Sequence, residues 1–348
     1  MSASPPPRPV LHTGERVRVR SAEEILATLD QNGTVDGLPL MPETLKFAGR
    51  ELPVHLSAHK TCDTINHKGT TRRMDYAVHL VGARCDGSAH GGCQAGCQLF
   101  FKEEWLERAD GSPIRPERPH AGTIPLPLEV IESGTSAGTD TDGEPLYRCQ
   151  ATELVRATSY LPVQDWRQYV DDVRTGNVPL GATLRSLGLS AFNNFQKLSR
   201  KLPSRLRIRE GAFYPFYRGT GAAKQPAAGL GLQPGEMVEV KSKDEIMSAL
   251  GPNNRNRGLW FDAEMLPYAG RRGRVLGKIE KIVDEVTGRM LKLRDCVVID
   301  QVNCAGQFNR YCPRSDYIYW REAWLRRVPE KSPTKAAECT DVTDNAKV

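Results

Sequence analysis

The residues of this chain with the clearest chemical potential are three cysteines and a histidine inside one short segment. Cys85, His90, Cys93 and Cys97 lie within thirteen residues that also hold four glycines. Thiolates bind soft or borderline metals when three or four of them converge on one point. Glycines let the backbone turn its N–H groups toward sulfur, as iron–sulfur sites require. The segment therefore predicts a cysteine-ligated metal centre.

The spacing of these thiols does not identify the metal. Cys-x7-Cys-x3-Cys matches neither the usual zinc-finger spacing nor the usual ferredoxin spacing. The glycine density and the irregular spacing favour an iron–sulfur cluster over zinc. The ligand that completes the site is Cys62, Cys149 or His90. The competing interpretation is that the thiols are small buried packing residues in a glycine-rich turn.

A second pair of thiols repeats the first spacing. Cys85-x7-Cys93 recurs as Cys304-x7-Cys312, although Asp316 stands where Cys97 would be and Asn309 where His90 would be. Cys304 and Cys312 therefore either join one site shared across a pseudo-two-fold axis or form a separate site. Together with Cys296, eight cysteines precede the polar tail that holds Cys339, enough for two four-thiolate clusters.

The cysteine spacing belongs to a longer internal repeat. Residues 14–49 align without a gap to residues 235–270, with 15 of 36 positions identical, and Glu103-x-Trp105-Leu106 recurs as Glu322-x-Trp324-Leu325. Cysteine and tryptophan are rare residue types, so their recurrence in the same register indicates a duplicated module.

Local patterns predict the elements of each module. An alternating strand comes first, and a short helix follows whose capping boxes are Ser21-x-x-Glu24 and Ser242-x-x-Glu245. Strands such as 274–283 come next, and residues 283–293 predict a hairpin that turns at Thr287-Gly288.

Each module combines short expected strands with glycine turns. The string Pro267–Val275 resembles the glycine-centred turn of KOW-type domains and of the small barrel in nitrile hydratase β subunits. The resemblance covers about 40 residues of each module. It implies an SH3-like barrel and carries no activity with it.

The expected fold class is α+β, with two duplicated SH3-like β-barrel modules separated by a partly helical insert. Residues 13–109 form the first module with its cysteine cluster, residues 110–232 the insert and residues 233–328 the second module. Residues 1–12 and 329–348 are proline-rich or polar without periodicity, which predicts disorder.

The insert carries two helical patterns and a basic run. Trp166, Tyr169, Val170 and Val173 predict the first helix, and apolar residues from Leu184 to Leu198, including Phe192 and Phe195, predict the second. The phenylalanines are most simply the buried face of that helix. A basic run follows, with six cations in thirteen residues and no acid among them: Lys197, Arg200, Lys201, Arg205, Arg207 and Arg209.

This basic run has aromatic residues nearby, a combination that can bind single-stranded nucleic acid. A solvated helix end is the simpler interpretation, with nucleic-acid contact and partner docking as alternatives. The sequence alone therefore predicts no salt-sensitive nucleic-acid binding at physiological ionic strength.

Two further motifs carry little weight. His55-x3-His59-x2-Cys62 would share one face only on a helix, and the strand expected there separates the histidines from the cysteine. Gly134-x-Ser136-x-Gly138 has the nucleophile-elbow spacing but stands in a polar loop, without the strand and helix which that motif needs. No phosphate-cradling loop or zinc-protease motif is present in the sequence.

Composition limits the remaining classes. The net charge of +6 demands no polyanionic partner, and no run of 18 apolar residues predicts a membrane span. The N-terminus lacks the apolar stretch of a signal peptide, so a cytoplasmic protein is expected.

Two hypotheses follow. The first is a metalloprotein, or metalloenzyme, with an iron–sulfur cluster or zinc and a small-molecule substrate or redox partner. The second is a nucleic-acid or ribonucleoprotein binding module with tandem KOW-like barrels, structural zinc and a contact surface at residues 197–209.

Overall fold

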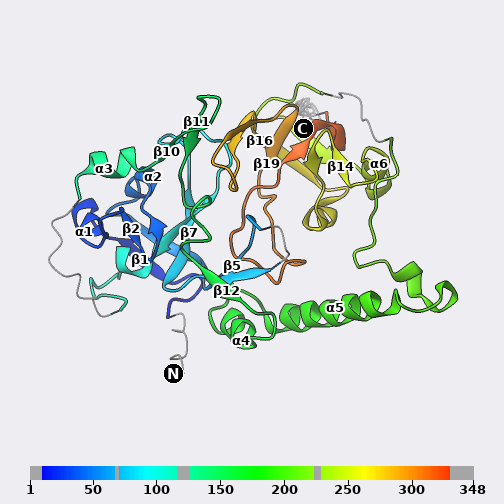
Figure 1. Ribbon diagram of the computed structural model, residues 1–348, viewed down its shortest axis with the longest axis horizontal. Coiled ribbons are helices and arrows are strands. Elements are labelled where there is room, and N and C mark those ends of the chain that lie inside the picture. Colours follow the sequence, from blue (N-terminus) through cyan, green and yellow to red (C-terminus); the bar gives the residue numbers. More distant parts are fainter. Residues whose placement is uncertain (1–9, 67–69, 116–125, 223–228, 330–348) are drawn as a thin grey trace, which may run out of the picture.

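The computed structural model describes residues 10–66, 70–115, 126–222 and 229–329, and it has the predicted mixed α+β class. Two five-stranded antiparallel sheets dominate, and a helical segment runs beneath them in the view of Figure 1. Residues 1–12 and 329–348, which we expected to be disordered, lie almost wholly outside the described residues, and so does Cys339. Leu11 is fully buried in the first core, two residues before the expected module boundary.

The first sheet has the strand order β8-β7-β4-β1-β9. Smaller pieces complete this half of the molecule. The elements are β1 (Arg16–Val19), α1 (Ala22–Leu26), β2 (Thr34–Val35), β3 (Leu38–Pro39), α2 (Pro42–Leu45), β4 (Glu51–Ser57), β5 (Lys60–Cys62), β6 (Thr71–Arg73), β7 (Ala77–Arg84), β8 (Gln98–Lys102), η1 (Glu103–Trp105) and β9 (Leu106–Arg108).

The second sheet has the order β20-β19-β16-β13-β21, so corresponding strands occupy corresponding places. Its elements also follow the same sequence along the chain. They are β13 (Met237–Val240), α6 (Lys243–Ser248), β14 (Arg255–Asn256), β15 (Leu259–Trp260), η4 (Ala263–Tyr268), β16 (Arg272–Lys278), β17 (Lys281–Val283), β18 (Met290–Lys292), β19 (Cys296–Ile299), β20 (Trp320–Arg321), η5 (Glu322–Trp324) and β21 (Leu325–Arg327).

Both capping boxes form as predicted. The Ser21 hydroxyl accepts from the Glu24 N–H while the Glu24 carboxylate accepts from the Ser21 N–H, and Ser242 with Glu245 repeats the arrangement. Each cap turns the chain from the first strand of its module onto the sheet. Ile25 of α1 is then fully buried, which stabilises the fold by roughly 2 kcal/mol.

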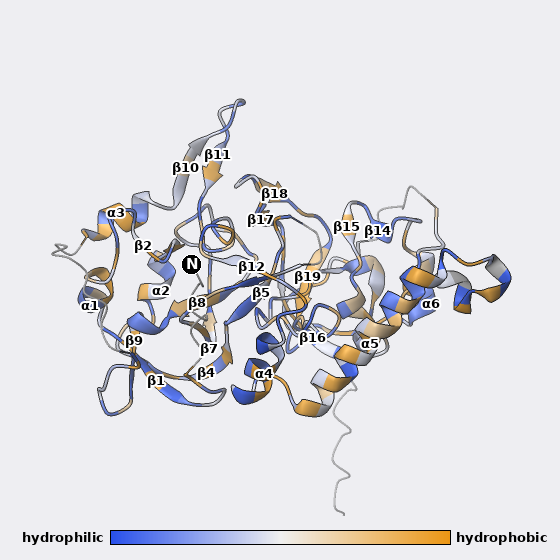
Figure 2. Cartoon of the chain, turned by 60° about the horizontal axis from the view of Figure 1, so that its bottom comes forward, coloured by the Kyte–Doolittle hydropathy of each residue, from blue (hydrophilic) through white to orange (hydrophobic). Residues whose placement is uncertain are grey.

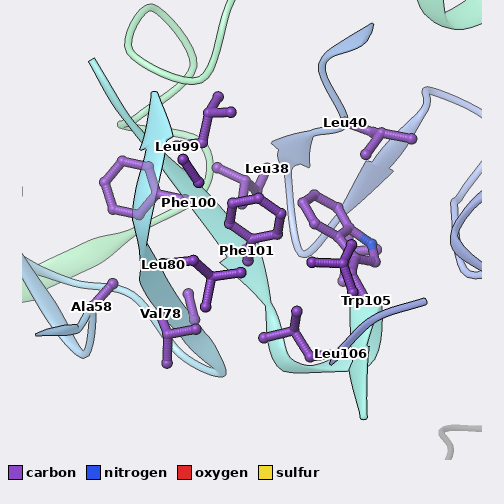
Figure 3. Close-up of a cluster of buried hydrophobic side chains, with 14 of the residues drawn as sticks. Leu38, Leu40, Ala58, Val78, Leu80, Leu99, Phe100, Phe101, Trp105 and Leu106 are labelled. Carbon is purple, nitrogen blue, oxygen red and sulfur yellow. The ribbon is translucent and has the colours of Figure 1, made fainter. Parts of the chain in front are cut away.

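Two tryptophans mark the centres of the two cores. Trp105 and Trp324 are both fully buried, each at the end of the short 3-10 helix that precedes the last strand of its sheet. Figure 3 shows Trp105 beside Leu106 and Phe101. The Trp105 indole N–H donates to the Thr28 hydroxyl at 3.1 Å, so its one polar atom is satisfied inside the core.

The predicted hairpin of the second module forms between β17 and β18, and Thr287 and Gly288 lie in its turn. The strand expected at 274–283, however, is two strands, β16 and β17. The corresponding stretch of the first module likewise breaks between β4 and β5. These breaks let a three-residue strand leave the main sheet and reach the opposite module.

The first part of the insert belongs structurally to the first module. Ile131, Leu154 and Ala157 join its core, and one strand pairs with β6. Two helices then lead toward the second module. The elements are α3 (Leu128–Ser133), β10 (Ser136–Thr139), β11 (Pro145–Tyr147), β12 (Ser159–Leu161), α4 (Arg167–Arg174), α5 (Leu180–Ser199), η2 (Ser204–Leu206) and η3 (Ile208–Gly211).

The two predicted helices exist, but their buried faces are polar. Trp166 and Val170 are exposed, whereas Asp172 of α4 is buried against Lys60 and 3.2 Å from the His59 ring. On α5 the buried residues are Thr183, Gln196 and Ser199, and Phe195 is 49% exposed. The expectation that Phe195 lies on the buried face is therefore wrong, because α5 stands away from both sheets (Figure 1). Figure 2 shows the hydrophobic residues along α5 in orange. None of the described helices is long and apolar enough to cross a membrane.

Candidate metal centre

Four of the predicted cysteine ligands, together with His90, line one cavity where the two modules meet. Its volume is about 230 Å³, and Cys85, Cys93, Cys97 and Cys149 all contribute to its wall. The first three come from the loop between β7 and β8, and Cys149 comes from the loop after β11. Strand pairing brings the ends of the first loop together, because the Cys85 N–H donates to the Cys97 carbonyl at 2.9 Å.

The β7–β8 loop folds tightly around a glycine. Gly87 has φ +68°, and its carbonyl accepts from the N–H groups of His90 and Gly92. A Cβ atom at Gly87 would lie 2.0 Å from the Cys93 carbonyl oxygen. Only glycine fits this close approach, which packs residue 87 against the Cys93 backbone.

Glu43 and His90 form a buried polar chain that ends at Cys85. The Nδ1 of His90 lies 3.1 Å from Oε1 of Glu43, and its Nε2 lies 3.7 Å from the Cys85 sulfur. Glu43 and His90 are 1% and 2% exposed. The second oxygen of Glu43, Oε2, is buried and accepts no hydrogen bond from a described residue. Glu43, Cys85 and His90 thus offer three ligand atoms within 4.8 Å of one another.

The charges of Glu43, His90 and the neighbouring thiols stabilise one another. Burial would lower the pKa of His90, but hydrogen bonds to Cys85, Cys93 and Glu43 raise it to about 12. Burial would likewise raise the pKa of the Cys93 thiol, yet the hydrogen bond from His90 and two backbone N–H groups lower it below its usual range. These hydrogen bonds therefore favour the thiolate of Cys93, the form that binds metals. Burial instead raises the pKa values of the Cys97 and Cys149 thiols.

Backbone N–H groups point at the sulfurs. Cys93 accepts from the N–H of Ala95 and, at 3.3 Å, from the N–H of Val283 in the opposite module. Cys149 accepts from the N–H groups of Ala151 and Thr152. Hydrogen bonds of this kind to cysteine sulfur recur in iron–sulfur sites, where they tune the cluster.

The second module closes the cavity. The Gln94 side-chain oxygen accepts from the N–H groups of Glu280 and Lys281, and the Tyr319 hydroxyl donates to the Ala95 carbonyl. Apolar side chains from both modules complete much of the wall. They include Met41, Leu99, Phe100, Ile282, Leu291 and Tyr319.

Cys62 and Cys312 form a separate pair at the symmetric place on the module interface. The Cys62 N–H donates to the Cys312 sulfur at 3.1 Å, just as the Val283 N–H donates to Cys93. Burial raises the pKa of a thiol, but hydrogen bonds from Cys62 and Arg314 lower that of Cys312 to about 7. Neither Cys62 nor Cys312 lines the 230 Å³ cavity.

The predicted ligands are thus divided. Cys85, Cys93, Cys97 and Cys149 share the cavity with His90, and Cys62 pairs with Cys312. Cys304 packs against the second core, where burial raises the pKa of its thiol. Cys304 and Cys312 therefore do not line the cavity that the other four cysteines share.

The other sequence motifs stay apart from the cavity. His55 lies in β4, His59 lies between two strands beside Asp172, and Cys62 lies in β5, so the three do not converge. Ser136 opens an exposed strand of a two-stranded hairpin, with no helix behind it.

Glu43 was missed by sequence reasoning, although the repeat held a signal for it. Position 43 aligns with Glu264, and both glutamates are buried. Glu43 accepts from the Ala89 N–H, and Glu264 accepts from the N–H groups of Gln307 and Phe308 in the Cys304–Cys312 loop. An acid that recurs in a repeat and then proves buried indicates a structural or ligand role.

These two glutamates differ in charge because their neighbours differ. Burial would raise both pKa values, but His90 brings that of Glu43 below its ordinary value. Asn309 stands in the place of His90 in the second module, and burial with nearby Asp262 raises the pKa of Glu264 to about 7.

We expect Glu264 to make the protein less stable as pH rises from about 4.5 to 7. The folded protein binds the Glu264 proton more tightly than the unfolded chain, so the free energy of unfolding falls by up to about 3 kcal/mol over this range. Urea unfolding across this range should show a smaller fall for Glu264→Gln. Glu280→Gln, which removes an exposed carboxylate, should keep the wild-type slope; equal slopes for all three proteins would contradict this prediction.

Comparison with models of known protein families and with curated proteins finds no match.

Proposed function

We propose that the protein is a metalloprotein whose cavity between the modules holds an iron–sulfur cluster, with Cys85, Cys93, Cys97 and Cys149 as ligands. One observation carries the proposal. Four cysteine side chains and a largely apolar wall surround a single space of about 230 Å³. Four thiolates are the ligand set that iron–sulfur clusters use.

The spread of the sulfurs favours a cluster over a single ion. Zinc–sulfur bonds of about 2.3 Å hold the sulfurs around one zinc roughly 3.5–4 Å apart. Among the described residues, no three cysteines offer sulfurs within 4.8 Å of one another. A cluster separates its ligands more widely than one ion does, because each thiolate binds a different iron.

The surrounding residues suit such a group. N–H donors at Cys93 and Cys149 offset the negative charge of thiolates, and His90 donates to Cys85 and Cys93. Oε1 of Glu43 lies 3.1 Å from Nδ1 of His90, on the side of the ring away from Cys85. A bound cluster would supply electron transfer or a Lewis-acidic iron. The chain would then act on a small molecule or on a redox partner.

Anaerobic purification followed by metal and sulfide analysis tests the proposal. The protein should be brown, with broad visible absorption, and should contain iron and acid-labile sulfide in equal amounts. A colourless protein without iron or sulfide after anaerobic purification, and after reconstitution with both, would contradict it.

Zinc is the second candidate, favoured by the convergence of Glu43, Cys85 and His90. In this arrangement Nε2 of His90 would bind the ion while Glu43 holds Nδ1, a common outer-shell role for a carboxylate. His90→Asn separates the two candidates, because Asn309 already occupies the equivalent place in the second module. We expect His90→Asn to keep its iron and sulfide, whereas a zinc site would lose its metal.

We also propose that the two halves are a duplicated SH3-like module. The shared strand order, the paired capping boxes and the two glycine-centred cysteine loops support this origin. Gly306 repeats the role of Gly87, because its φ is +62° and a Cβ there would lie 2.4 Å from the Cys312 nitrogen. Deleting residues 1–229 tests whether the second module folds on its own. An independent module should still unfold cooperatively.

A further inference from the structure

A second, larger groove lies between α5 and the second module. Its volume is about 1420 Å³, above the usual range for small-molecule pockets of roughly 300–1,000 Å³. Its wall combines α5, the segment that follows α5, and the Cys304–Cys312 loop of the second module.

The groove has a strongly basic wall. No described residue that lines it is acidic. Its cations are Lys197, Arg200, Arg207, Arg209, Arg218 and Arg310.

The charge on most of these cations is not balanced by a described carboxylate, although Nε of Arg200 and Nε of Arg207 donate to backbone carbonyls. Lys197, Arg200, Arg207 and Arg209 are not within ion-pair distance of any carboxylate that the structure describes. Uncompensated positive charge gathered along a concave wall attracts a polyanion.

Aromatic rings alternate with these charges. The Arg200 guanidinium lies 4.1 Å from the Phe213 ring centre, and that of Arg209 lies 4.6 Å from the centre of Phe216. Phe213 is 41% exposed. The Tyr214 and Phe308 rings lie 6.0 Å apart and connect the insert with the second module. The Tyr214, Phe216 and Phe308 rings are half-buried. Accessible rings beside guanidinium groups are surfaces on which unpaired bases stack.

The polar face of α5 explains how this wall is positioned. Gln196 donates to the carbonyls of Ile208 and Ala212, and Asn193 exchanges hydrogen bonds with the backbone of Tyr214. The buried amides therefore hold the chain after α5 in place, and the same turn sends its arginines and aromatic rings toward the groove.

We propose that this groove binds single-stranded nucleic acid, with phosphates on the cations and bases on the aromatic rings. The sequence alone favoured a solvated helix end for residues 197–209. The groove reverses that preference, since the cations share one wall with five aromatic residues: Phe213, Tyr214, Phe216, Tyr217 and Phe308. A duplex is not the expected ligand, because its stacked bases cannot reach the rings.

Fluorescence anisotropy on the full chain tests the proposal, using a labelled oligothymidylate of about 16 nucleotides over about 50–200 mM salt. Affinity should fall steeply with salt. Neutralising Arg207 and Arg209 to glutamine should flatten the slope of log K against log salt by about 1.4, since each single-strand phosphate contact contributes about 0.7.

The basic run supplies a matched control. Lys201 and Arg205 belong to the same run and are exposed, but they do not line the groove. Their double glutamine variant should keep the wild-type slope. Phe213→Leu, which retains apolar volume but loses a stacking face, should weaken binding about tenfold without changing the slope.

Three outcomes would overturn the proposal. They are no binding at the lowest salt, duplex binding as tight as single-strand binding, and equal loss of slope in the two double variants. An acidic polypeptide that competes as well as the oligonucleotide would also count against nucleic acid. Lys197→Gln, a single exposed change expected to lower the slope by about 0.7, keeps the test decisive if the Arg207/Arg209 variant does not fold.

Discussion

Cys93→Ser should lose the proposed iron–sulfur cluster and destabilise the protein by about 4 kcal/mol or more, because metal binding and folding are thermodynamically coupled. Cys93 lines the cavity, receives N–H groups from both modules and lies in hydrogen-bond contact with His90. Removing its thiolate takes away a ligand and a contact between the modules. Iron and sulfide analysis together with urea unfolding measures both effects.

Cys312→Ser is the matched control for this change. Cys312 and Cys93 are each 6% exposed, and each sulfur accepts an N–H group from the opposite module. Cys312 does not line the cavity, so its variant should keep the metal and lose only about 1 kcal/mol of stability. Unchanged metal content in both variants would make the Cys85–Cys97 thiols packing residues.

Gly87→Ala should be almost as damaging, at about 4 kcal/mol, although it removes no ligand. The added Cβ would lie 2.0 Å from the Cys93 carbonyl oxygen and 2.6 Å from its nitrogen, and backbone atoms cannot rotate away. The positive φ of Gly87 adds strain for any residue with a Cβ. Unfolding measurements and metal analysis should show a less stable protein with a depleted cavity.

Alanine substitutions at two other glycines distinguish backbone strain from loss of the metal site. Gly111 has φ +80° with open space around its Cβ position, so Gly111→Ala should cost about 1 kcal/mol and keep the metal. Gly306→Ala carries the same kind of clash in the second module and should destabilise the protein while its cavity still binds metal. Loss of metal in Gly306→Ala as severe as in Gly87→Ala would place the two loops in one site.

Local patterns predicted local structure well. Ser21 and Ser242 form their capping boxes because a capping box depends only on residues three positions apart. The β17–β18 hairpin forms for the same reason. The apolar stripe of α5 predicted a helix correctly but the wrong buried face, because what covers a helix depends on distant parts of the chain. There the covering segment, residues 208–214, is held by the amides of Gln196 and Asn193.

By itself, the sequence determined that residues 14–49 recur at 235–270, where each capped helix begins and that three thiols and His90 share one loop. Spacing and periodicity carry this information because the interacting residues are close along the chain. Only the tertiary structure decided that Cys149 lines the same cavity as the cysteines of that loop, and that Cys62 pairs with Cys312 instead. It also placed Glu43 beside His90. These contacts depend on how a strand of one module reaches the loop of the other, which no local pattern specifies.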